Sequence, residues 1–312
     1  MPGPYAHLTL VTLLTGDSKM DDFELPGEAK KALKKYYDFC CLGSISPDYP
    51  YLKIGGKGKK AAMNWANAMH HKYYTYTKEN ILHVGIDFLK DQTGNKLEKC
   101  FSWLLGYASH VAADVTCHPM TNLLVGDYEA DNQKKHRESE MHQDAYIYNK
   151  KLGRNVRTAE HIQNVVGTCT EHDTDKVDQE IKEVWAHMLS RTFPDLYKRN
   201  KKIGFDNWHS CILTLIDDFA EELPYFPTML LFGKGLVYPD IDDIEEKFIS
   251  DLGTPVGPMS YEKVFDRALD NCGRIWKIIS DAVYLQDQTY LKKINIWNLD
   301  NGQIIRTPKV MW

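Results

Sequence analysis

Two histidines and one aspartate recur at four-residue intervals in the middle of this 312-residue chain. His110, Asp114 and His118 lie in the stretch GYASHVAADVTCHPM, and residues spaced by four project from one face of a helix. With 12 His and 43 Asp+Glu in the chain, chance would produce such a triplet only about 0.06 times. Imidazole and carboxylate groups on one helical face are suitable ligands for a divalent metal ion, so the triplet predicts a metal site.

The element that must position this triplet is a long helix over residues 96–120. Its apolar residues recur at three- and four-residue steps, and Pro119 is expected to end it. A helix that is apolar on most faces is usually buried, and an unpaired buried charge is very costly. A divalent cation would compensate the buried carboxylate. The alternative is that His110 and His118 are core histidines with ordinary hydrogen-bond partners.

Other segments offer further ligands, each of which also has an ordinary explanation. His7 lies in the apolar segment PYAHLTL, as a core histidine would, and Asp48 lies between two prolines in SISPDYPYL, where aspartate commonly forms turns. His70 and His71 are adjacent in NWANAMHHKYY, and helical spacing allows only one of them to face a shared centre. We expect His70 to be the ligand, although the sequence leaves the choice between the two open.

A second helical segment, HRESEMHQDAY, carries His136 and Glu140 one turn apart. Asp144 lies a further turn along the same face. The similarly spaced pair of His83 and Asp87 has no third member, so we interpret it as coincidental.

The number and type of these groups indicate which metal they would bind. The predicted ligands are His7, Asp48, His70, His110, Asp114, His118, His136 and Glu140. Imidazole and carboxylate without thiolate suit zinc, and eight groups exceed one tetrahedral site. They fit two or three zinc ions that share a bridging carboxylate. Asp114 is the expected bridge because it lies between the two histidines of the triplet.

The composition narrows the class of protein and its compartment. Hydrophobic residues make up 43% and charged residues 26%, a balance typical of soluble globular domains, and the net charge of −5 does not favour nucleic acid as a partner. Seven scattered cysteines without a CxxC motif favour a reducing compartment. The sequence has no apolar run of membrane-spanning length, and LTLVTLL near the N-terminus is too short for a signal peptide. We expect a cytoplasmic protein, or one exported without a cleaved signal.

The periodicity is helical almost throughout, so the predicted fold class is all-α. We expect one helical domain over residues 1–240 and a small C-terminal extension over residues 241–312. Strand signal appears only late, where residues 293–299 and 303–307 flank the turn sequence Asp-Asn-Gly. This pattern is typical of a β-hairpin.

Five motifs, in this order, make the sequence similar to the zinc-dependent phospholipases C: PGPYAHLTLV, GSISPDYPYL, WANAMHH, GYASHVAADVTCHP and HRESEMHQDAY. That family shares an all-α fold and a trinuclear zinc centre with the zinc-dependent single-strand nucleases. The resemblance covers residues 1–150 clearly and implies the same fold to about residue 240.

Carried over to this chain, the resemblance implies a division of the ligands among three sites. The implied ligands are Asp48, His70, His110 and Asp114 for one zinc, His118, His136 and Glu140 for a second, and His7 with Asp114 for part of a third. Secreted members complete the third site with an N-terminal Trp, which this chain lacks. We therefore expect two to three zinc ions.

The activity that the resemblance implies is hydrolysis of glycerophospholipids to diacylglycerol and a phosphorylated headgroup. Zinc would bind the phosphate oxygens and generate the hydroxide that attacks phosphorus, with Asp48 and Asp114 as the catalytic carboxylates. Such a substrate implies transient contact with a membrane surface. Four aromatic residues are candidates either for the substrate cleft, where they would contact a choline headgroup, or for the core: Tyr49, Tyr51, Trp65 and Trp103.

Two alternative functions remain open at this point. A nuclease for single strands would use the same metals, but the acidic net charge and the absence of an evident basic and aromatic stripe disfavour it. A non-catalytic protein with structural metals is disfavoured because structural zinc prefers closed, often thiolate-rich sites. The sequence leaves open the headgroup, the oligomeric state and the role of residues 241–312.

Overall fold

The structure is a computed structural model that describes residues 2–53, 58–72, 77, 79–127, 132–200, 202–220 and 238–312. Within these residues the fold is all-α, as predicted, with isolated β-bridges in place of strands. No helix among them is long and apolar enough to cross a membrane. The helices are α1 (Pro4–Leu14), α2 (Asp17–Asp22), α3 (Gly27–Lys35), α4 (Tyr37–Ile45), η1 (Ser46–Leu52), α5 (Lys59–Met69), α6 (Ile81–Lys90), α7 (Gly94–Val125), α8 (Gln133–Leu152), η2 (Val156–Thr158), α9 (His161–Thr168), α10 (Gln179–Thr192), α11 (Pro194–Arg199), α12 (Phe205–Ala220), η3 (Ile241–Asp243), η4 (Glu246–Phe248), α14 (Tyr261–Tyr284) and α15 (Tyr290–Lys293).

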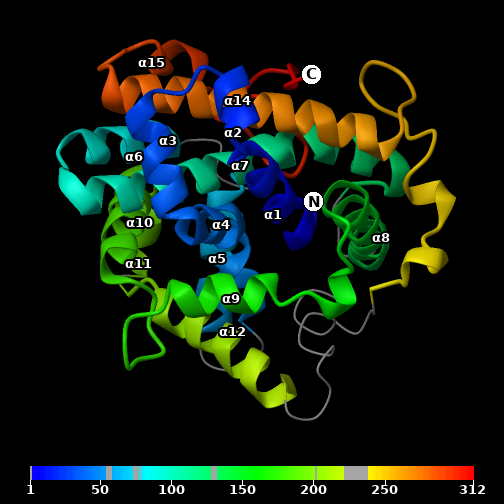
Figure 1. Cartoon of the computed structure of the whole chain (residues 1–312), viewed down its shortest axis with the longest axis horizontal. Helices are drawn as coiled ribbons and strands as arrows, with labels where there is room; N and C mark the ends of the chain where they lie inside the picture. Colours follow the sequence, from blue (N-terminus) through cyan, green and yellow to red (C-terminus); the bar gives the residue numbers. More distant parts are fainter. Residues whose placement is uncertain are drawn as a thin grey trace.

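The long helix predicted from the sequence is α7, which runs for 32 residues and has every residue from Cys100 to Thr121 buried. It packs most extensively against α4 and α14. Figure 1 shows α14 running along α7, with α1 and α4 near the centre of the view. A helix apolar on most faces needs neighbours around its whole circumference, and this arrangement supplies them.

Glycines allow α4 and α7 to pack with their backbones in contact. A Cβ atom on Gly106 of α7 would lie 1.9 Å from the carbonyl oxygen of Cys40, and one on Gly43 of α4 would lie 2.1 Å from that of Trp103. No side chain fits at either position without moving the helices apart. The contact matters for the candidate site because Asp48 follows α4 directly and His110 lies one turn beyond Gly106.

The prediction that Pro119 ends the central helix is wrong. The helix continues to Val125 and ends at Gly126, which has a φ of 86°. Proline cannot donate the hydrogen bond that the carbonyl of Val115 would accept in a regular helix. Gly302 packs on this turn so closely that a Cβ atom there would lie 2.4 Å from the carbonyl oxygen of Val115. The C-terminal chain therefore covers the interrupted turn, and the helix continues beneath it.

The predicted β-hairpin near the C-terminus is also wrong. The turn itself forms, with Gly302 at a φ of 71° and its N–H donating to the carbonyl of Asn298 over 2.9 Å. Pairing beyond the turn is limited to isolated bridges, one of which joins Trp297 and Ile304. On the side away from this pairing, the N–H of Leu299 donates to the carbonyl of His70, over 2.9 Å, and joins the turn to the helical body.

The last part of the chain shares its core with the helices that precede it. Trp276 of α14 donates from its indole N–H to the hydroxyl of Ser109 on α7, over 2.7 Å, and Cys272 and Ile279 are buried in the same apolar cluster as α7. The domain boundary at residue 240 stays a prediction.

Candidate metal centre

Five of the eight predicted ligands meet where α1, η1, α5 and α7 come together. The positions are His7 on α1, Asp48 on η1, His70 directly after α5, and His110 and Asp114 on α7. Four of these side chains are fully buried, whereas that of Asp48 is 15% exposed. Asp48 is therefore the member of the group that solvent can reach.

The carboxylate of Asp114 lies between the imidazoles. Its Oδ1 is 3.4 Å from His7 Nε2, and its Oδ2 is 3.3 Å from His110 Nε2 and 3.7 Å from His70 Nε2. Asp48 Oδ1 is 3.2 Å from His70 Nε2 and 4.0 Å from His110 Nε2. Two overlapping groups result, one of His7, His110 and Asp114 and one of Asp48, His70 and His110, each with its ligand atoms within 4.8 Å of one another. Each group is compact enough to surround a cation.

Backbone carbonyls orient two of the imidazoles toward the centre. His70 Nδ1 lies 2.8 Å from the carbonyl oxygen of Ala66, and His110 Nδ1 lies 2.8 Å from that of Ser44. A carbonyl can only accept a hydrogen bond, so each Nδ1 carries the proton and each Nε2 can offer its lone pair. This is the arrangement by which metal-binding histidines are usually held in one tautomer.

The ligand atoms of the centre lack hydrogen-bond partners within the described part of the chain. They are both carboxylate oxygens of Asp114, Oδ1 of Asp48 and Nε2 of His7, His70 and His110. A buried polar atom without a partner costs about 1–3 kcal/mol, and more when it is charged. A fold that gathers six such atoms at one point needs something to satisfy them. Imidazole nitrogens and carboxylate oxygens fit zinc, so the residues present match the metal.

The pKa shifts of the residues in the centre also favour a bound cation. Burial raises the pKa of Asp114, but His110 and His7 outweigh that effect and hold the pKa well below its usual range. Burial likewise opposes ionisation of Asp48, yet His110 and His70 lower its pKa. Burial alone would lower the pKa of His70, whereas Asp48 and Asp114 raise it to about 9. Protons on imidazoles thus balance the carboxylates, and a divalent cation would replace those protons.

The other three predicted ligands do not join either group. His118, His136 and Glu140 are buried, but no group of three possible ligands within 4.8 Å among the described residues includes them. The Nδ1 of His118 contacts the carbonyl oxygen of Leu299, and Nε2 of His136 lies 2.6 Å from that of Gly126. Their assignment to a further zinc stays a prediction.

The structure separates the alternatives that the sequence left open around His70. His70 lies in the centre, whereas His71 has a left-handed φ of 52° and its ring lies 5.4 Å from that of Phe193.

Of the four aromatic candidates, three are buried core residues: Tyr49, Trp65 and Trp103. Tyr51 is partly exposed and its ring lies 5.4 Å from that of His70. It is the candidate that is both partly exposed and next to the centre.

Asp144, which the sequence placed on the ligand-bearing face of α8, has a different role. Its carboxylate accepts hydrogen bonds from the N–H groups of Tyr5 and Ala6, over 3.1 and 2.9 Å, and from the hydroxyl of Tyr238 over 3.0 Å. Helix α1 begins after Gly3 without a capping side chain of its own. Asp144 caps it from 138 residues away and so fixes the first turn, from which His7 projects. The signal for this contact in the sequence was the lack of a capping side chain before His7.

A third group of possible ligands lies on the surface and is better explained without a metal. Glu138, His142 and Glu245 lie together, but the N–H of Glu245 donates to His142 Nδ1 over 3.1 Å. The proton of the neutral ring must then be on Nε2, which lies 3.8 Å from the Glu245 carboxylate. Both nitrogens are therefore engaged by Glu245, and Lys247 also pairs with that carboxylate.

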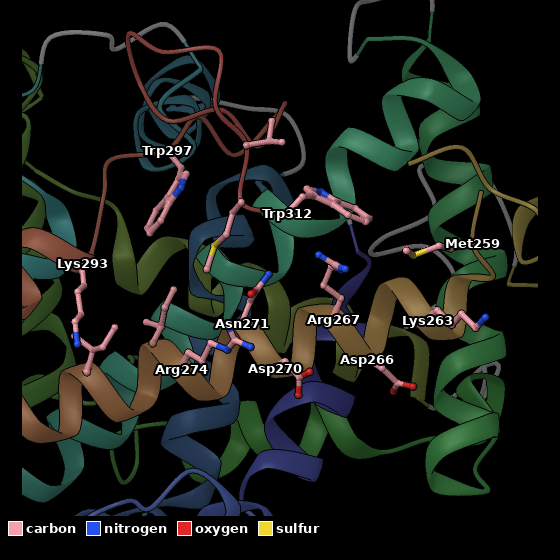
Figure 2. A pocket seen from close by; sticks show the side chains of 14 residues that line it. Met259, Lys263, Asp266, Arg267, Asp270, Asn271, Arg274, Lys293, Trp297 and Trp312 are labelled. Atoms are coloured by element: carbon pink, nitrogen blue, oxygen red, sulfur yellow. The ribbon is translucent and has the colours of Figure 1, made fainter. Parts of the chain in front are cut away.

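A groove of about 840 Å³ lies between α14 and the C-terminal segment. Figure 2 shows Trp297 and Trp312 facing Arg267, Asn271 and Arg274 of α14 across it. None of the eight predicted ligands lines it. The groove is therefore separate from the ligands of the metal centre.

The comparison with protein families gives one match. The family model described as zinc-dependent phospholipase C matches residues 6–226, which include all five residues of the centre and the three predicted ligands outside it. No curated protein and no solved structure matches the chain. The match covers most of the chain and fits a buried set of histidines and carboxylates with unsatisfied ligand atoms. This protein belongs to the zinc-dependent phospholipase C family.

Proposed function

We propose that this protein is a zinc-dependent phosphodiester hydrolase that cleaves glycerophospholipids to diacylglycerol and a phosphorylated headgroup. The observation that carries the proposal is the position of Asp114, whose unpartnered oxygens face His7 on one side and His70 and His110 on the other. Zinc bound there would act as a Lewis acid toward the phosphate and lower the pKa of a bound water.

The positions of the residues indicate which of them would hold each zinc ion. His110 has one free lone pair, so it belongs to a single ion, together with Asp48 and His70. His7 would hold a second ion through the other oxygen of Asp114. Closely spaced cations that share one carboxylate are the arrangement that suits charge development on both the attacking and the leaving oxygen.

Asp48 is suited to a second role as proton acceptor. It is the partly exposed member of the centre, so the attacking water and the phosphate would approach it from solvent. Its lowered pKa keeps the carboxylate ionised at neutral pH, as a proton acceptor must be. Tyr51, beside His70, would contact the headgroup. Since such a substrate lies in a bilayer, the protein would bind a membrane surface transiently.

A panel of substrates tests this proposal. Zinc-loaded protein should release diacylglycerol from phosphatidylcholine vesicles, it should leave single-stranded oligonucleotides intact, and chelation should abolish the release. Elemental analysis of the same sample should find at least two zinc ions per chain. Cleavage of oligonucleotides alone would identify a nuclease instead. Two bound zinc ions without turnover of any phosphodiester would leave the metals a structural role.

A further inference from the structure

The turn formed by residues 298–302, called here the 298–302 loop, reaches the metal centre from outside the family match, which ends at residue 226. The carbonyl of Leu299 is the contact of His118 Nδ1, and the N–H of Leu299 donates to the carbonyl of His70 over 2.9 Å. One residue of the loop is thus bonded to two predicted ligands, one on α7 and one at the end of α5.

Several independent contacts hold the loop in this position. Asn122 of α7 donates from its side chain to the carbonyl of Asp300 over 2.9 Å, and Lys72 pairs with the Asp300 carboxylate at 3.1 Å. Gly302 lies against the turn of α7 that contains Pro119, with no room for a Cβ atom. On the other side, Trp297 is 4% exposed and lines the groove against α14 (Figure 2). The loop is therefore held against α7 and the residues that follow α5, and Trp297 just before it is buried beside α14.

We propose that the 298–302 loop positions two predicted zinc ligands: it holds His118 in the tautomer that can bind a metal ion, and it fixes the end of α5 at His70. A carbonyl oxygen accepts only, so the contact with Leu299 puts the proton of His118 on Nδ1 and leaves the lone pair on Nε2. The bond to the carbonyl of His70 ties the end of α5 to the same loop. Partners of this kind typically change metal affinity 10- to 100-fold when they are lost.

This inference rests on the proposed function and on the predicted role of His118 as a ligand of a further zinc, and it adds to the site a segment that the family match does not include. A backbone carbonyl cannot be removed by substitution, so its test must displace the loop. Gly302→Ala does this, because the added Cβ atom would collide with the carbonyl of Val115. Gly257→Ala is the matched control: Gly257 also has a positive φ, of 111°, but has open space around its Cβ position. Both variants carry the same kind of backbone strain, and only one displaces the loop.

The measurement is zinc affinity, by competition with a chromophoric chelator, alongside the visible spectrum of the cobalt-substituted protein and circular dichroism. Gly302→Ala should bind one zinc equivalent about 10- to 100-fold more weakly than wild type, with an altered cobalt spectrum, while Gly257→Ala should match wild type. Equal zinc affinity and cobalt spectra for Gly302→Ala and wild type would overturn the proposal.

A milder variant covers the case in which Gly302→Ala fails to fold. Asp300→Asn removes the ion pair with Lys72 and should weaken one zinc equivalent in the same direction. Asp281→Asn is its control, because it removes a similar pair with Lys277 at 2.8 Å on α14. If Asp300→Asn folds and keeps wild-type zinc affinity and cobalt spectrum, the loop does not position the centre. Wild-type protein that binds no zinc would instead refute the proposed function.

Discussion

Asp144 allows a quantitative test of how the fold positions His7. Its carboxylate accepts hydrogen bonds from Tyr5 N–H, Ala6 N–H and the Tyr238 hydroxyl, at 3.1, 2.9 and 3.0 Å. Asp144→Ala leaves three buried donors without an acceptor, each at a cost of about 1–3 kcal/mol. Water entering the vacated space would restore part of this, so we expect the free energy of unfolding to fall by about 3–5 kcal/mol. That is a large share of the roughly 5–15 kcal/mol typical of a folded domain.

The functional consequence should be the loss of one zinc ion. With its first turn uncapped, α1 no longer holds His7 at 3.4 Å from Asp114. Thermal unfolding of the metal-free protein measures the stability, and elemental analysis after dialysis measures the zinc. Asp178→Ala is the control, because Asp178 caps α10 through the N–H groups of Glu180 and Ile181, in a part of the fold that carries no predicted ligand. It should lower stability and leave the zinc content unchanged.

The pH dependence of stability gives a second measurement on the same residue. Burial raises the pKa of Asp144 from its ordinary 3.8 to about 7, although its three donors oppose this. Folding therefore disfavours the ionised form, and the stability that this group contributes is greatest below pH 4 and declines as the pH rises to 7. Asp144→Asn cannot ionise. In metal-free protein its free energy of unfolding, measured relative to that of wild type, should therefore rise as the pH increases over that range. If Asp144→Ala unfolded like wild type, the capping role would be refuted. If Asp144→Ala lost stability but kept all its zinc, the link between the cap and His7 would be refuted.

The remaining predictions concern the centre itself. Asp114→Asn should lose zinc and at least about 100-fold in activity, because the amide removes the charge and one of the oxygens that face the two groups. Asp87→Asn, on a pair without a third member, should keep nearly full activity, and equal activity in the two variants would remove Asp114 from the site. His7→Ala should bind one zinc ion fewer with an unchanged circular dichroism spectrum. Full zinc content in His7→Ala would show that this histidine is a core residue.

The parts of this structure that the sequence predicted are those determined within one element. Four-residue spacing on an apolar helix was enough to place His110 and Asp114 on one face of α7, because helical geometry is local. The cap of α1 by Asp144 and the contact of His118 with Leu299 join residues 138 and 181 positions apart. Neither contact leaves a pattern within one segment of the sequence, so periodicity and motif spacing cannot predict these contacts.

Local signals failed at two places where the C-terminal chain packs on the helices. Proline removes one backbone hydrogen bond from a helix interior, yet α7 continues past Pro119, where Gly302 packs on the turn. Asp-Asn-Gly did form a turn, but pairing beyond it is limited to isolated bridges, and the turn is joined to the helical body by the bond from Leu299 to His70. Both places involve contacts of the C-terminal chain with the helical body: Gly302 packs on α7, and Leu299 bonds to His70 directly after α5.

The dimensions of the candidate centre depend on residues that have no metal-binding chemistry. Gly43 and Gly106 let α4 and α7 touch, and a methyl group at either position would approach a carbonyl oxygen to about 2 Å. Helix α4 supplies the carbonyl of Ser44 that orients His110, and η1, which follows it, supplies Asp48. Separating the two helices by one ångström would therefore shift Asp48 and the tautomer-fixing bond of His110 together. Metal–ligand distances tolerate only about 0.2 Å, so this glycine contact sets the geometry of the centre as directly as the ligands do.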